Sequence, residues 1–149
     1  MVIDRVSAWM RQAEHDLAHA ETALAARSFD WVCYAASQAA EKFLKAGLIS
    51  TGEDHVWGHN LHMLLDGLAK GIGSGPCPDG LADDARLLTQ YTVLTRYPLG
   101  DQTTAPMDMF SHAHAVAALE AAKRLRDWTL AHVLHARKPL PDDPSEPVP

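Results

Sequence analysis

The sequence predicts an all-α protein, an antiparallel up-and-down bundle of four to five helices. Apolar residues recur every three or four positions in several long segments, and no segment alternates apolar and polar residues with a period of two. A length of 149 residues suits one domain with its own core. We expect the bundle over residues 1–137 and a proline-rich disordered tail over residues 138–149.

The two longest early segments predict two long helices. Residues 4–26 place apolar side chains on one face, while charged residues take the others. A second helix is expected over residues 29–50, with Ser28 or Asp30 available to cap its start. Gly52 follows it and can adopt the left-handed conformation that ends a helix.

Two shorter helices and one long helix are expected in the rest of the bundle. The shorter ones cover residues 60–70 and 81–95, separated by a segment over residues 71–80 that is too rich in glycine and proline for regular structure. The long helix is expected over residues 106–136, with proline in its first turn. Its buried side is expected to include Phe110, Ala113, Ala117 and Trp128.

Composition excludes several classes of protein. The formal charge of −6 argues against a protein that coats nucleic acid through a broadly basic surface. Cys33 and Cys77 form no C-x-x-C motif, which indicates neither a disulfide framework nor a thiolate metal site. The chain shows no secretion signal and no apolar run long enough for a membrane span, so we expect a cytoplasmic protein without a membrane. No phosphate-binding or dinucleotide-binding glycine motif occurs, and we expect no cofactor.

A polar stripe on the second helix is the first candidate site. Its four residues follow the spacing i, i+3, i+4, i+7 in an otherwise alanine-rich helix. Three interpretations are open: a solvated face with Glu/Lys neighbours, a dimer interface, or a ligand site with the lysines on phosphate. Trp31 and Tyr34 lie earlier on the same face and can stack on a base. The stripe consists of Gln38, Glu41, Lys42 and Lys45.

Two further candidates lie near helix ends. Arg96, followed by Tyr97 and a proline, can donate to the last carbonyls of a helix or bind phosphate in a fork. His59 or Asn60 can cap the third helix, and a histidine can also transfer protons near neutral pH. We favour structural roles, and keep His59, Arg96 and Tyr97 as candidates for ligand binding.

Arg126 and His132 in the last helix form an R-x5-H pattern. In a ribonuclease such a pair would polarise the phosphate and move a proton. On a straight helix, however, residues six positions apart lie about 120° apart around the axis. Chance matches are also common because the chain has nine histidines. The i, i+4 histidine pairs lack a third ligand, so we expect no metal site.

Four strings in order carry a resemblance to a known family. They are AEHDL at 13–17, QAAEKFLKA at 38–46, GHNL at 58–61 and RYP at 96–98. The chain resembles the prokaryotic HEPN domain over about residues 5–135. The resemblance implies a helical bundle, commonly a homodimer, often encoded beside a minimal nucleotidyltransferase in toxin–antitoxin modules. It also implies nucleotide binding, and several branches of the family are metal-independent ribonucleases that use an R-x4-6-H motif.

We therefore predict a HEPN-like homodimer that binds a nucleotide or RNA and works with a nucleotidyltransferase-type partner. One alternative is a metal-independent ribonuclease toxin that uses Arg126 and His132. A second alternative is a non-catalytic helical adaptor. The residues predicted to bind ligand are Gln38, Glu41, Lys42, Lys45, His59, Arg96 and Tyr97.

Overall fold

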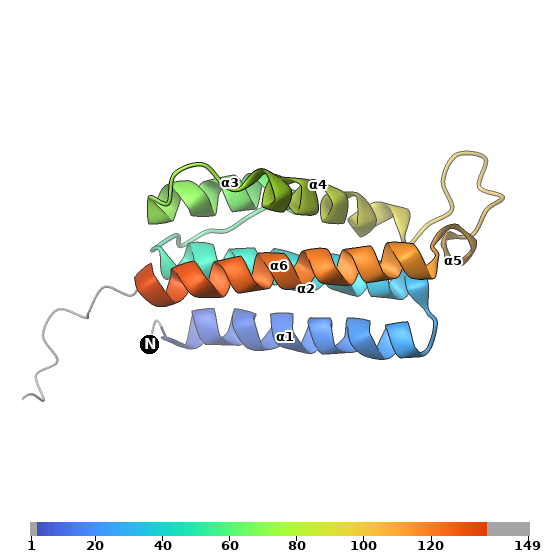
Figure 1. Cartoon of the computed structure of the whole chain (residues 1–149), viewed down its shortest axis with the longest axis horizontal. Helices are drawn as coiled ribbons and strands as arrows, with labels where there is room; N and C mark the ends of the chain where they lie inside the picture. Colours follow the sequence, from blue (N-terminus) through green and yellow to red (C-terminus); the bar gives the residue numbers. More distant parts are fainter. Residues whose placement is uncertain (1–2, 137–149) are drawn as a thin grey trace, which may run out of the picture.

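The computed structural model describes residues 3–136, which form six helices without a strand in that range (Figure 1). The all-α prediction is confirmed, and the predicted tail over residues 138–149 lies outside the described residues. None of the helices described is both long and apolar enough to cross a membrane. The elements are α1 (Ile3–Ala25), α2 (Phe29–Ser50), α3 (Leu61–Ile72), α4 (Asp79–Leu94), α5 (Pro106–Met109) and α6 (His112–Ala136).

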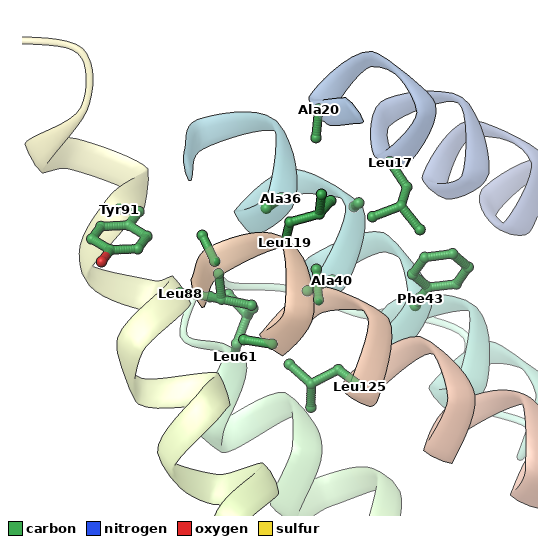
Figure 2. Packing of buried hydrophobic residues seen from close by; sticks show 14 of the residues in the cluster. Leu17, Ala20, Ala36, Ala40, Phe43, Leu61, Leu88, Tyr91, Leu119 and Leu125 are labelled. Atoms are coloured by element: carbon green, nitrogen blue, oxygen red, sulfur yellow. The ribbon is translucent and has the colours of Figure 1, made fainter. Parts of the chain in front are cut away.

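The helices form three layers with nearly parallel axes. Helix α1 makes one layer, α2 and α6 make the middle layer, and α3 and α4 together make the third (Figure 1). Side chains from all three layers meet in one core, in which Leu17, Phe43, Leu61, Leu88 and Leu125 are buried (Figure 2). Helix α2 therefore packs against neighbours over most of its circumference.

Small residues allow α2 to occupy this central position. Ala36, Ala39 and Ala40 are fully buried, so the neighbouring helices can approach its backbone closely. The closest approach is at Gly47, where an added Cβ would lie 2.7 Å from a methyl group of Leu68 and 3.1 Å from one of Thr129. The alanine-rich sequence of α2 is thus explained by packing on several sides.

The helix ends agree with most of the expected signals. Asn60 caps α3, its side-chain oxygen accepting a hydrogen bond from the Met63 N–H at 3.3 Å. Gly73 ends the same helix in the left-handed conformation at φ +65°. Ser28 stands at the N-cap of α2, as expected, although its hydroxyl makes no capping hydrogen bond.

The prediction of one continuous helix over residues 106–136 was wrong. The chain forms the short α5, continues with Phe110 in an extended conformation, and begins α6 at His112. Phe110 is buried and packs edge-on against Tyr91 of α4, with ring centroids 5.5 Å apart. Ser111 immediately precedes α6, and its N–H donates to His114 Nδ1 at 3.0 Å. The tertiary contact of Phe110 outweighs the local preference for a continuous helix.

The buried side of α6 also differs from the expected one. Ala113 and Ala117 were expected to be buried but are exposed, and Trp128 is only partly buried. In a helix this rich in alanine, the sequence does not define one apolar face strongly. The side chains buried on α6 are Ala115, Ala118, Leu119, Ala121, Ala122, Leu125, Thr129 and Val133.

Candidate ligand-binding groove

A surface groove runs along α1 and α2, which we name the α1–α2 groove. It consists of two adjoining pockets of about 270 and 260 Å³ that share Lys42 as a lining residue. From α1 the lining comes from residues spaced three or four apart, and from α2 it comes from the polar stripe and the turns before it. The lining residues are Ala8, Trp9, Gln12, Asp16, His19, Trp31, Tyr34, Ala35, Gln38 and Lys42.

One end of the groove is aromatic. Trp31 is 50% exposed and meets Tyr34 edge-on, with ring centroids 5.9 Å apart. The Arg96 guanidinium lies over the Tyr34 ring at 5.0 Å and over the Tyr97 ring at 5.3 Å. Arg96 Nε donates to the carbonyl of Thr92 at 2.8 Å, which fixes the side chain beside the end of α4.

Arg96 pairs with no carboxylate among residues 3–136. Its side chain is exposed, and only Nε is used in the contact with α4. The remaining N–H groups of the guanidinium can therefore donate to an anion at the mouth of the groove.

The middle of the groove holds a pair of opposite charges. Lys42 Nζ forms an ion pair with the carboxylate of Asp16 on α1, and both side chains are partly buried. This contact joins the two helices that form the groove. It also neutralises much of the lysine charge, so an anionic ligand would compete with Asp16 for Lys42.

A buried charged cluster lies beside the groove, next to its lining residue Trp9. Glu41 and Lys45 are only 5% and 6% exposed, and Lys45 Nζ donates to Glu41 Oε1 at 2.8 Å. The same oxygen accepts a hydrogen bond from His59 Nδ1 at 2.9 Å. Lys45 also lies over the ring of Trp9 at 5.7 Å. Glu41 Oε2 is buried and has no hydrogen-bond partner within the described part of the chain.

The structure brings the predicted ligand-binding residues together along one side of the molecule. Gln38 and Lys42 line the groove, Glu41 and Lys45 form the cluster with His59, and Arg96 and Tyr97 meet Tyr34 at the aromatic end. Their role in binding a ligand stays a prediction. His59 does not cap α3, since Asn60 takes that position.

Arg126 and His132 lie elsewhere, on α6, and neither lines the groove. Arg126 Nε donates to its neighbour Asp127 at 2.9 Å. His132 Nδ1 donates to the carbonyl of Trp128 at 2.7 Å, and the two rings stack 4.4 Å apart. Helix α6 is unbroken between the two candidates, so they stay about 120° apart around its axis. Their catalytic role is a prediction that this arrangement does not favour.

Sequence reasoning missed the contribution of α1 to the groove. Trp9, Asp16 and His19 line it, and their spacing of seven and three positions places them on one face of the helix. That periodicity was a usable signal. It could not show that this face turns toward the stripe of α2, because the rotation of one helix against another is set by packing.

No group of three His, Cys, Asp or Glu side chains that could hold a metal ion occurs in the described part of the chain. The side chains that line the groove thus offer a lysine paired with a carboxylate, three aromatic rings, two amides and one histidine, and the Arg96 guanidinium lies against one of the rings. These groups suit an anion attached to a flat, polar ring system.

The fold and the groove define a small α-helical bundle domain with an open, charged and aromatic surface site. The model of the HEPN domain family matches residues 6–133, and the chain therefore belongs to the HEPN domain family. The resemblance read from the sequence is confirmed. No curated protein matches the chain.

Three solved structures are similar over nearly their whole length. TT1696 from Thermus thermophilus has a TM-score of 0.77 and 32% identity, with 89% of this chain and 98% of that chain covered. ST0689, an archaeal HEPN homologue, has a TM-score of 0.71 and 26% identity, with 86% and 97% covered. An HEPN domain protein of Thermotoga maritima, TM0613, has a TM-score of 0.66 and 26% identity, with 87% and 98% covered.

Proposed function

We propose that this HEPN protein binds a nucleotide, or the nucleotides of an RNA strand, in the α1–α2 groove. The observation that carries the proposal is the position of Arg96. Its guanidinium lies over the Tyr34 ring and has no acidic partner in the described residues, and Tyr34 in turn contacts the half-exposed ring of Trp31. Arginine binds phosphate through two parallel hydrogen bonds, and aromatic rings stack on bases of any sequence.

The contacts along the groove suggest a role for each side chain. Arg96 takes the phosphate, Trp31 stacks on the base, and the Gln38 amide donates to or accepts from the base or ribose. Lys42 assists when the ligand displaces Asp16. We give Lys45 a supporting role, because its ammonium is buried and bound to Glu41.

We further propose that the protein is a cytoplasmic homodimer that works with a nucleotidyltransferase-type partner, as one half of a toxin–antitoxin pair. Family membership supports this assembly. Large apolar side chains are exposed at several places on the surface and offer apolar area that a contact between proteins could bury. They include Trp57, Met63, Val93, Tyr97, Met107 and Met109.

Fluorescence anisotropy of a labelled single-stranded RNA, with AMP and ATP as competitors, tests the binding proposal. We expect saturable binding that Arg96→Ala and Trp31→Ala each weaken by at least about fivefold, the lower end of the loss seen when a stacking ring is removed. Arg86→Ala is the matched control, because Arg86 is an exposed arginine of α4 that already pairs with Asp83 and His62.

The salt dependence of binding gives a second measurement. Each phosphate contact contributes about −0.7 to the slope of log K against log salt concentration for a single strand. We expect Arg96→Ala to make the slope shallower by about this amount. An unchanged affinity in Arg96→Ala would refute the proposed site. No affinity for any nucleotide or RNA would favour the non-catalytic adaptor.

A further inference from the structure

Asp16 connects the two pockets of the α1–α2 groove. It lines one pocket, Gln12 lines the other, and Lys42 lines both. The Asp16 Oδ1 atom accepts a hydrogen bond from Gln12 Nε2 at 2.9 Å, and Oδ2 accepts one from Lys42 Nζ. We name these three residues the junction. One carboxylate therefore engages a donor from each part of the groove.

The junction is better suited to uncharged groups than to phosphate. The side chains of Lys42 and Asp16 are only 24% and 16% exposed, so salt screens their charges less than those of a surface pair. A phosphate that approaches Lys42 must displace the carboxylate or lie beside it, and the two negative charges repel each other. A hydroxyl or a base N–H can instead donate to Asp16, because a carboxylate offers about four acceptor positions and the two contacts described use two of them.

The Arg96 end of the groove has the opposite preference. Arg96 lies over the Tyr34 ring and pairs with no carboxylate among residues 3–136, so a phosphate meets no competing anion there. Lys42 follows Tyr34 by eight residues of α2, which is about 12 Å along the helix axis. A ligand whose phosphate lies on Arg96 therefore presents a different chemical group to the junction.

We propose that Asp16 is the specificity-determining residue of the α1–α2 groove. It confines phosphate to Arg96 and selects ligands that place uncharged ribose and base groups at the junction. This inference rests on the proposed function. The favoured ligand class is a nucleoside monophosphate or the terminal nucleotide of an RNA strand. A strand that brings a second phosphate to Lys42 must first displace Asp16, and it therefore binds less tightly than its charge would allow.

Two probes that differ in phosphate number test this role. AMP carries one phosphate, whereas the labelled single-stranded RNA carries many. We expect Asp16→Asn to raise the affinity for the RNA by at least about tenfold, the lower end of what a hydrogen bond to a charged group contributes, because Lys42 becomes available to a second phosphate. The affinity for AMP should stay unchanged, since its phosphate already lies on Arg96. A merely structural role of Asp16 would change both affinities in the same direction.

The salt dependence of RNA binding reports the same change. A second phosphate contact should make the slope of log K against log salt concentration steeper by about 0.7 in Asp16→Asn. Lys42→Met in the same background should remove this extra slope, because it deletes the released ammonium. Circular dichroism checks that the variants are folded, and Asp16→Ser, which also removes the charge, gives a second test of the same prediction.

Glu21→Gln is the matched control for the change in charge. Glu21 is another carboxylate of α1 that pairs with a lysine of a different helix, Lys123 of α6, at 3.1 Å. Neither of these two residues lines the groove. We therefore expect Glu21→Gln to leave the affinities for AMP and RNA unchanged.

The outcomes separate the two proposals. RNA that binds through Arg96 with the same or lower affinity in folded Asp16→Asn would overturn the role of Asp16 and leave the binding function in place. An equal gain for AMP and RNA, or the same gain in Glu21→Gln, would also overturn it. Absence of binding of both probes, in the wild type and in Asp16→Asn, would overturn the proposed function and the role of Asp16 with it.

Discussion

The buried ion pair of Glu41 and Lys45 gives a sharp test of how the groove is held together. Lys45→Met keeps the length and apolar stem of the side chain but removes the ammonium that lies 2.8 Å from Glu41 Oε1. Breaking a buried pair on one side costs about 3–5 kcal/mol. We expect about 3 kcal/mol, the lower end of that range, because His59 still donates to the same oxygen. For a chain of this size, such a loss lowers Tm by roughly 6–12 °C.

Urea and thermal unfolding followed by circular dichroism measure this loss of stability. The double variant Glu41→Leu with Lys45→Met is the control, because it removes both charges together. We expect its stability to return to within about 1 kcal/mol of the wild type, since apolar replacements of buried ion pairs are often neutral. The reasoning would be refuted if Lys45→Met were as stable as the wild type, or if the double variant were no more stable than Lys45→Met.

Two further predictions concern the core. Gly47→Ala should lower stability by about 1 kcal/mol, because its Cβ would lie 2.7 Å from Leu68 and overpacking outweighs the gain in helix propensity. Gly67→Ala should raise stability by about 0.5–1 kcal/mol, because the nearest atom to an added Cβ would be 3.7 Å away. If the two glycine variants unfolded at the same urea concentration, both expectations would be contradicted. Burial raises the pKa of Cys33 to about 12, so its thiol stays protonated near pH 8 and should react with a thiol reagent only after unfolding. The less buried Cys77 should react in the folded protein, and equal rates would contradict this expectation.

Most of the fold could be predicted because its signals are local. The spacing of apolar residues gave α2 over residues 29–50, the range that the structure shows, and Asn60 gave the start of α3. The break at Phe110 could not be predicted in this way. It depends on a contact with Tyr91, and nothing in the residues around Phe110 shows that this partner lies within reach.

For the candidate site, the sequence predicts the residues of one helix face but not the residues that they contact. The stripe on α2 follows from helical spacing alone, so the amino-acid sequence is sufficient to indicate it. The residues that contact the stripe could not be predicted from the spacing of residues along α2. The pairing of Lys42 with Asp16 depends on how α1 is rotated, and the contact of His59 with Glu41 depends on the path of the loop after α2.

On the proposed function, the availability of each cation in and beside the groove limits which nucleic acid the site can accept. Lys45 and Lys42 are already paired with carboxylates, whereas Arg96 is stacked on rings and pairs with no carboxylate in the described residues. A chain with a net charge of −6 and one available groove arginine cannot gain much affinity from phosphate contacts alone. Stacking must supply the rest, and Trp31 can stack only on a base that is not already stacked in a duplex. The proposed ligand is therefore a free nucleotide or an unpaired RNA segment.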